Sequence, residues 1–245
     1  LLLEVSDSPD FGKVQHQQLC LARKEANYCC KVDLTGLQPG RSYYYRFSDS
    51  NTVSATGHGK TLPSGSVSEV RFAVLSCSNY PAGYFHVYQQ VAQQQLDAVL
   101  HLGDYIYEYE QGGYATERSV ELGRALAADN QAEMVSLTDY RKRYALYRSD
   151  KDLQQAHANH SFICVWDDHE ITNDAWTDGA ENHQPNEGDY QLRKLNALQA
   201  YYEWMPIRPL VSGQQQSLSR SFAFGDLVDL HMLDTRIEGR NQQLE

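Results

Sequence analysis

The succession of a strand, a helix and a second strand between residues 70 and 104 constrains the fold most. The segments "VRFAVLSC" (70–77) and "DAVLHLGD" (97–104) are short, mostly apolar runs, which are typical of buried strands. Between them, the apolar residues of "YFHVYQQVAQQQL" (84–96) recur at spacings of three and four, which predicts an amphipathic helix. These residues are Phe85, Tyr88, Val91, Ala92 and Leu96. A strand–helix–strand unit predicts two parallel strands joined by a right-handed crossover.

A third run of the same kind, "SFICVW" (161–166), leads directly into a cluster of charged and titratable residues. The residues that follow it are Asp167, Asp168, His169 and Glu170. Adjacent carboxylates repel one another, and their burial without a partner is unfavourable. We therefore expect a positive charge at the end of this strand.

Polar clusters follow all three predicted strands at their carboxyl ends. Cys77 ends the first, "GDYIYE" (103–108) ends the second, and "DDHE" (167–170) ends the third. Ligands of open α/β sheets bind beyond the carboxyl ends of the strands. Cations would allow carboxylates to gather there, so the sequence predicts a metal as the partner of Asp168.

Other segments also carry secondary-structure signals. Helices are predicted over 137–150 and 189–206, the second ended by Pro206. The segments "SRSFAFG" (219–225) and "LVDLHMLDTR" (227–236) are predicted to form a hairpin across Gly225-Asp226.

Residues 1–62 have a different sequence pattern, in which short segments are separated by turn residues. Apolar and polar positions alternate in "SYYYRF" (42–47), after a Pro-Gly turn, which predicts a small antiparallel β-sandwich. The phrase "VDLTGLQPGRSYYYRF" (32–47) resembles the closing hairpin of fibronectin type III domains. The Ser-, Gly- and Pro-rich segment that follows predicts a linker over 63–69. Residues 70–245 then form the main domain.

Five cysteines leave the redox state of the chain open. They are Cys20, Cys29, Cys30, Cys77 and Cys164. Cys29 and Cys30 are neighbours on what is expected to be one strand, so their side chains should point to opposite faces. A disulfide between Cys20 and one of this pair is one alternative, and free buried thiols are the other.

Composition excludes two classes of partner. The formal net charge is −11 and Lys and Arg form no cluster, which argues against a nucleic-acid-binding surface. No run approaches the roughly 18 apolar residues that a membrane helix needs. An acidic protein can still act on an anionic substrate where metal ions reverse the local charge.

The sequence resembles a known family through several phrases in order. They are "SCSNYPAGYF", "HLGDYIYEY", "DYRKRYALYRSD", "WDDHEITNDAW", "AYYEWMPIRP" and "LDTR". The pattern GDxxY followed by Asp-His-Glu is similar to calcineurin-like metallophosphoesterases, including purple acid phosphatases, and the longer phrases resemble PhoD-type alkaline phosphatases. The resemblance implies an α/β fold, the four-layer α/β/β/α sandwich, of which residues 70–245 would be the N-terminal portion.

The resemblance also implies roles for individual residues. Cys77 would take the place of the first Asp ligand and bind Fe³⁺ as a thiolate, and Tyr107 would bind it as a phenolate. Asp104 would bridge two metals. Asp168 would stand in place of the usual Asn and bind a second metal, which in this family is Ca²⁺. His169 would lie outside the metal shell, near the leaving group or the phosphoryl oxygens.

Further polar residues allow two interpretations each. His183 and Arg193 are candidates for phosphate binding, and a solvent-facing role is the alternative. Asp167 is interpreted as a structural neighbour of Asp168, and Glu170 as a residue that caps the next segment or orders the loop. Arg236 is expected to pair with Asp234 or a neighbouring carboxylate.

One expected phrase is missing. Related enzymes complete the site with a Gly-His-x-His or Gly-Asp-x-His phrase, which does not occur downstream, and His231 is a poor substitute. The resemblance therefore implies further ligands beyond Glu245.

The functional hypothesis is a metal-dependent phosphoric ester hydrolase, an alkaline phosphatase that could also cleave diesters, in which a metal-bound hydroxide attacks phosphorus. Small phosphate esters would be its substrates, and the protein would be a periplasmic or secreted monomer. The alternatives are a calcium-stabilised surface-binding protein without activity and a phospholipase-D-like phosphodiesterase.

Overall fold

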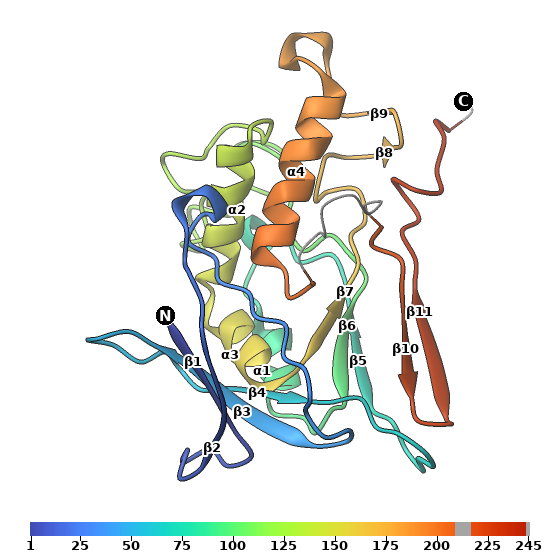
Figure 1. The fold of residues 1–245 in the computed structure, drawn as a ribbon. Helices are drawn as coiled ribbons and strands as arrows, with labels where there is room; N and C mark the ends of the chain where they lie inside the picture. The colour runs from blue at the N-terminus through green and yellow to red at the C-terminus, as the bar shows by residue number, and fades with distance from the viewer. Residues whose placement is uncertain (209–216, 244–245) are drawn as a thin grey trace.

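The computed structural model describes residues 1–208 and 217–243, which form an N-terminal β-module and an α/β body (Figure 1). The strands are β1 (Leu2–Ser6), β2 (Val14–Leu19), β3 (Ser42–Ser48), β4 (Gly57–Lys60), β5 (Phe72–Leu75), β6 (Ala98–His101), β7 (Phe162–Cys164), β8 (Ala175–Trp176), β9 (Gly179–Ala180), β10 (Arg220–Phe224) and β11 (Val228–Met232). The α-helices are α1 (His86–Ala92), α2 (Leu137–Arg148), α3 (Lys151–Asn159) and α4 (Tyr190–Trp204), with short 3₁₀ turns at Lys24–Ala26, Tyr80–Ala82 and Pro185–Glu187. Within the described ranges, no helix has the length and apolar character that crossing a bilayer requires.

The body is built on a parallel sheet with the strand order β5-β6-β7. Phe72 pairs with Ala98, and Val99 pairs with Phe162, so the carboxyl ends of the three strands lie at one edge. The predicted strand–helix–strand unit is therefore confirmed, with α1 as its crossover helix. Every residue of β6 and β7 is buried, as expected for strands covered on both faces.

The helices begin where side chains cap their free backbone amides. Ser136 and Asp139 form a capping box at the start of α2, and Asp189 caps α4. α4 ends at Trp204, before Pro206, as the sequence predicts. α3 was not predicted. It begins at Lys151, directly after Asp150, whose carboxylate accepts hydrogen bonds from two backbone amides of the first turn.

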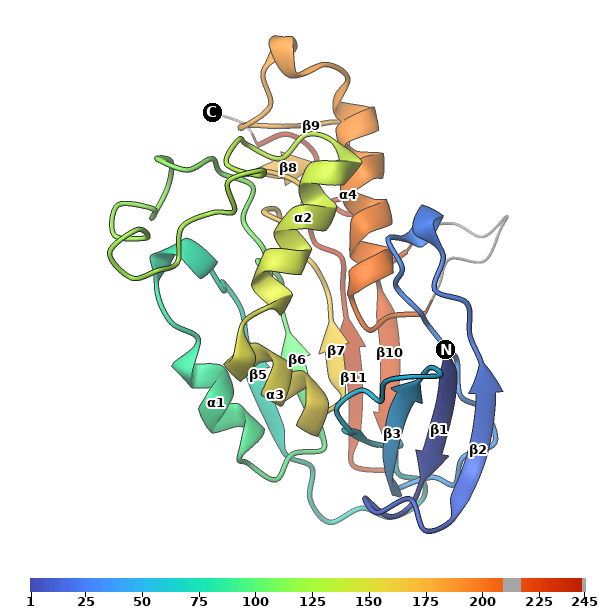
Figure 2. The ribbon, with the colours of Figure 1, turned by 90° about the vertical axis from the view of Figure 1, so that its left-hand side faces the viewer.

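The hairpin β10–β11 packs on the face of the sheet opposite the helices (Figure 2). Phe224 of β10 meets Phe72 of β5 edge-on, with 4.9 Å between ring centroids. Gly225 makes the turn at a φ of +62°, and a Cβ there would lie 2.3 Å from a methyl of Val67, so glycine is required. Helices, parallel sheet and hairpin form successive layers, which confirms the α/β class.

The N-terminal module differs in detail from the expected sandwich. Its strands form one antiparallel sheet in the order β2-β1-β3-β4, with Leu3, Val5 and Tyr43 in its core. Where a sandwich would have a second sheet, the chain over 32–37 covers this core without strand pairing among the described residues. A layer of coil replaces the second sheet because Val32, Leu34 and Leu37 supply enough apolar surface to close so small a core. The module is antiparallel, as predicted.

The cysteines of the module lie in coil and not on a strand, so that expectation was wrong. Asn27 and Tyr28 adopt positive φ angles, which breaks any extended run before Cys29. Of the two alternatives that the sequence left open, the structure has a disulfide between Cys20 and Cys30, and Cys29 is free.

The module contacts the body at the amino end of the sheet. Lys60 of β4 forms an ion pair with Asp97, which precedes β6, and its amide donates to the Ser161 hydroxyl before β7. The His58 ring is 2.9 Å from the carbonyl oxygen of Asn159 at the end of α3.

A second contact reaches the carboxyl end of α4. The Lys31 ammonium donates to the carbonyl oxygens of Tyr202, Met205 (2.7 Å) and Ile207 (3.0 Å). These acceptors include carbonyls that a helix end leaves without partners of its own. Lys31 thus caps α4 from another part of the chain.

Candidate metal centre

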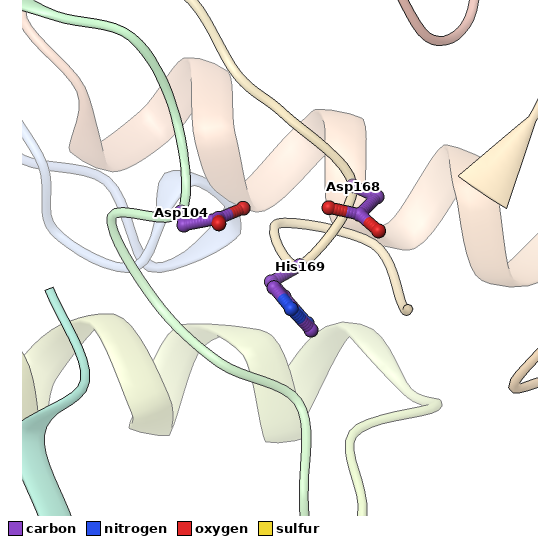
Figure 3. Close-up of side chains that lie close together, drawn as sticks. All are labelled: Asp104, Asp168 and His169. Atoms are coloured by element: carbon purple, nitrogen blue, oxygen red, sulfur yellow. The ribbon is translucent and has the colours of Figure 1, made fainter. Parts of the chain in front are cut away.

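Three potential metal ligands lie together where β6 and β7 end. The donor atoms of Asp104, Asp168 and His169 are all within 4.8 Å of one another. Figure 3 shows the two carboxylates on facing loops, with the imidazole beside them. We call these three residues the strand-end cluster. Parallel pairing explains the arrangement because it places the ends of neighbouring strands side by side.

Cys77 and Tyr107 approach the same cluster through Asp104. The Cys77 thiol and the Tyr107 hydroxyl both donate to Oδ2 of Asp104, at 3.3 Å and 3.4 Å. A thiol and a phenol therefore both contact one carboxylate oxygen. The four predicted metal ligands and His169 occupy one region of the molecule.

The loops that carry these side chains have an unusual backbone. Cys77 and Asp104 adopt φ angles of 59° and 53°, in the left-handed region that non-glycine residues rarely occupy. Two hydrogen bonds join the loops, from the Cys77 amide to the Gly103 carbonyl (3.1 Å) and from the Ser78 amide to the Asp104 carbonyl (2.8 Å). Gly103 is needed because a Cβ there would lie 2.1 Å from the amide nitrogen of Asp167.

Glu170 orders the loop, as the sequence suggested. Its fully buried carboxylate accepts backbone amides from Asp104 (3.0 Å), Tyr105 (2.7 Å) and Asp167 (2.9 Å). Burial and the neighbouring Asp104 raise its pKa to about 8 against the effect of these three donors. One side chain thus fixes the β6 and β7 loops relative to each other.

Asp104 has an unsatisfied charge. Its side chain is buried, and Oδ1 has no hydrogen-bond partner within residues 1–208 and 217–243. Burial, together with Asp168 and Asp167, raises the pKa of this carboxyl despite the opposing effect of His169. A buried acceptor without a partner is unfavourable, and a cation would satisfy it. The donor set therefore fits a bound metal.

Part of the positive charge at this site comes from the protein itself. The Arg236 guanidinium pairs with Asp167 at 2.5 Å and 3.1 Å, and with Asp174 at 3.4 Å. It also approaches Asp168 to 3.6 Å, so a metal is not the sole cationic neighbour of that residue. Asp167 is turned to Arg236, consistent with its interpretation as a structural neighbour.

His169 is held by a buried carboxylate that sequence reasoning missed. Its Nδ1 lies 2.8 Å from Oε2 of Glu108, a side chain with no exposed surface. Although burial lowers the pKa of His169, the hydrogen bond and charge of Glu108, with Asp168 and Asp104, raise it to about 9. The resemblance placed His169 outside the metal shell, and this stays a prediction; in the structure its imidazole lies beside Asp104 and Asp168.

Glu108 is itself held by three more donors. They are the Asn173 amide (2.7 Å), the Asn182 side chain (3.0 Å) and the Thr172 hydroxyl (3.3 Å). Burial raises the pKa of Glu108, but the contact with His169 and these donors lower it overall. The one sequence signal for Glu108 was its position at the end of "GDYIYE". Its partners lie more than sixty residues away in the sequence, so this signal did not identify them.

The two candidate phosphate ligands lie among other partners. The enclosed Arg193 guanidinium donates to Glu133 (2.7 Å), Glu187 (3.3 Å) and the Tyr140 hydroxyl (3.2 Å). A solvent-facing Arg193 is therefore wrong. His183 lies beside Arg193 and 3.1 Å from the Gly188 carbonyl. These contacts favour a structural role for both.

Known proteins match both parts of the chain. Residues 72–245 match the family of PhoD-like phosphatases, and residues 1–63 match the N-terminal domain of PhoD-like phosphatases. The chain belongs to the PhoD-like phosphatase family. Alkaline phosphatase D of Bacillus subtilis (strain 168) is 38% identical over 237 residues, which cover 95% of this chain and 40% of that protein.

Solved structures agree with this assignment. A structure of PhoD aligns with a TM-score of 0.85 and 36% identity, covering 96% of this chain and 45% of that one. Purple acid phosphatase PPD1 from yellow lupin (Lupinus luteus) aligns with a TM-score of 0.54 and 16% identity, covering 98% and 41%. The second likeness concerns the fold alone. The predicted resemblance is confirmed, and the chain spans less than half the length of these relatives.

Proposed function

We propose that this chain supplies metal ligands and catalytic groups to a phosphoric ester hydrolase, an alkaline phosphatase that also accepts phosphodiesters. The observation that carries the proposal is the convergence of Cys77 and Tyr107 on one oxygen of Asp104, whose other oxygen is buried without a partner among the described residues. Family membership supports the same reaction class.

We propose Fe³⁺ and Ca²⁺ as the metals: Cys77, Asp104 and Tyr107 would hold Fe³⁺, and Asp104 and Asp168 would hold Ca²⁺. Thiolate and phenolate are strong anionic donors that suit a trivalent ion, and carboxylate oxygens suit calcium. When bound, the metals would supply Lewis-acid stabilisation of phosphoryl charge and a lower pKa for water.

His169 would handle a proton beside the phosphoryl group. Because Glu108 accepts the hydrogen bond from Nδ1, the imidazole has a fixed orientation, and Nε2 remains for the substrate. Protonated Nε2 would donate a hydrogen bond to a phosphoryl oxygen or to the leaving oxygen. Tyr107 stacks on the imidazole with 4.3 Å between ring centroids, which limits its rotation.

We propose small phosphate esters as substrates and a periplasmic or secreted location, which the Cys20–Cys30 disulfide supports. All the candidate groups come from one chain, so a monomer is sufficient. The proposed division is a β-module over 1–62, a linker over 63–69 and a catalytic portion over 70–245.

The test compares Asp104→Asn with Asp97→Asn in the full-length protein, because these residues lie at opposite ends of β6. Asp104→Asn should reduce the hydrolysis of p-nitrophenyl phosphate and bis(p-nitrophenyl) phosphate at least about 100-fold, since it removes the shared ligand. Asp97→Asn should retain activity within about twofold, because Asp97 contacts Lys60 and the Arg71 amide and not the cluster.

Elemental analysis completes this test. Wild-type protein should contain iron and calcium and show the colour of a phenolate-to-iron charge-transfer band. Near-normal turnover by Asp104→Asn would refute the assignment. Calcium without iron, and no hydrolysis, would favour the surface-binding alternative, whereas diester cleavage alone would favour a phospholipase-D-like enzyme.

A further inference from the structure

Three buried polar side chains lie behind the strand-end cluster, and the proposed reaction does not use them. The Ser78 and Tyr88 hydroxyls are 2.5 Å apart, and His101 Nε2 is 3.0 Å from the Tyr88 hydroxyl and 3.4 Å from the Ser78 hydroxyl. All three residues are buried. We call this set the polar tether.

The direction of each hydrogen bond follows from the backbone. The Gly103 amide approaches Nδ1 of His101 at 3.4 Å, and an amide can only donate, so we assign the proton of the ring to Nε2. Nε2–H then donates to the Tyr88 hydroxyl, which donates to Ser78 Oγ. Burial lowers the pKa of His101 to about 3, so the ring stays neutral and keeps this pattern.

The tether joins three separate elements. Ser78 follows β5, His101 ends β6, and Tyr88 belongs to α1. Cys77, directly before Ser78, and Asp104, three residues after His101, both have a left-handed backbone. A left-handed non-glycine residue is unfavourable and persists where its surroundings hold it. The buried hydrogen bonds of the tether act here together with the Glu170 carboxylate and the two backbone hydrogen bonds between the loops.

We propose that Ser78, Tyr88 and His101 are positioning residues, which hold the Cys77 and Asp104 loops in the conformation that presents thiolate and carboxylate to one metal. This inference rests on the proposed function for the identity of the ligands. The residues act through the two loops and touch neither metal nor substrate.

The test uses Tyr88→Phe and Ser78→Ala in the full-length protein, with Tyr144→Phe as the matched control. Tyr144 is equally buried, and its hydroxyl has no hydrogen-bond partner among the described residues. Tyr88→Phe should weaken iron binding about 10- to 100-fold and shift the charge-transfer band, because neighbours that orient a ligand affect metal affinity to this extent. Tyr144→Phe should leave both within about twofold.

A second measurement works without metal. Amide hydrogen exchange at Cys77 and Ser78 in the metal-free protein should accelerate at least about tenfold in Tyr88→Phe and Ser78→Ala, relative to wild type and Tyr144→Phe. Suppose that exchange accelerates in both variants but the wild-type protein binds no iron. The inference that the tether positions the loops would then stand, and the proposed function would be refuted. Unchanged exchange and unchanged iron affinity in Tyr88→Phe would overturn the inference while the proposed function stands.

Discussion

Carboxylates at the two ends of the parallel sheet differ in whether the protein supplies partners for them. At the amino end, Asp97 pairs with Lys60 and accepts the Arg71 amide at 2.8 Å. At the carboxyl end of the same strand, Asp104 is buried beside Asp168 with one oxygen unpartnered among the described residues. Burial raises the pKa of both carboxyl groups. For Asp97, the hydrogen bonds and charges of Lys60 and Arg71 outweigh burial and lower the pKa overall. For Asp104, the neighbouring carboxylates raise the pKa further.

The difference separates the end of the sheet that holds the N-terminal module from the end where we propose the metal site. Where the protein supplies a cation for each carboxylate, the contact fastens the N-terminal module to the body. Where carboxylates exceed the cations, as around Arg236, a metal ion of the kind proposed above would neutralise the remaining negative charge. Charge satisfaction, and not carboxylate content, distinguishes the two ends.

Glu108→Gln should have the largest effect of the variants that test this comparison, and the effect should be a loss of activity. The amide would place an NH₂ group where Glu108 now accepts hydrogen bonds, so His169 would lose its fixed orientation. We expect kcat/KM to fall about 10- to 100-fold, measured by steady-state hydrolysis in the full-length protein.

The control for this variant is Glu69→Gln at the other end of the sheet. Glu69 forms an exposed ion pair with Arg71, so its loss should change neither activity nor stability by a measurable amount. Equal effects of the two variants would break the distinction between the sheet ends.

A smaller effect concerns stability without metal, where we expect opposite signs at the two ends. Asp97→Asn should lower the free energy of unfolding by about 1–2 kcal/mol, because it removes a charged acceptor of Lys60. Asp104→Asn should raise it by about 1 kcal/mol, because it removes a buried negative charge next to Asp168 whose Oδ1 has no hydrogen-bond partner among the described residues. Urea denaturation of the metal-free protein measures both, and destabilisation by Asp104→Asn would contradict the comparison.

The smallest expected effect is a pH dependence that differs between two histidines. Burial lowers the pKa of His160, at the amino end, from 6.5, so below that pH the unfolded chain binds more protons and stability falls. The pKa of His169 is raised to about 9, so its stabilising contribution is complete below pH 6.5 and is lost as the pH rises through about 9.

Denaturation of metal-free His160→Gln and His169→Gln between pH 5 and 10 tests this difference. His160→Gln should flatten the acid limb, and His169→Gln the alkaline limb, each by up to about one proton. His86→Gln, at an exposed helix position, is the control. Identical slopes in all three variants would show that neither histidine contributes.

Local pattern predicted most elements of the body, though not α3, because period and burial are properties of neighbouring residues. The strands before Cys77, Asp104 and Asp168 and the hairpin at Gly225 are examples. Strand ends also predicted the cluster, since parallel pairing brings successive ends together.

Long-range partners escaped prediction. The hydrogen bond from His169 to Glu108 and the ion pair between Arg236 and Asp167 each join loops more than sixty residues apart. The covering of the module by coil depends on how three apolar side chains fill a small space, which alternation in β3 does not encode.

The reach of Lys31 to the end of α4 has a consequence for how the molecule can be divided. Three carbonyl groups near that terminus obtain their proton donor from the N-terminal module. Trimming the module to isolate the larger piece would expose these acceptors and let the last turn fray. The two parts match separate family models, but the last turn of the long helix depends on a lysine of the N-terminal module.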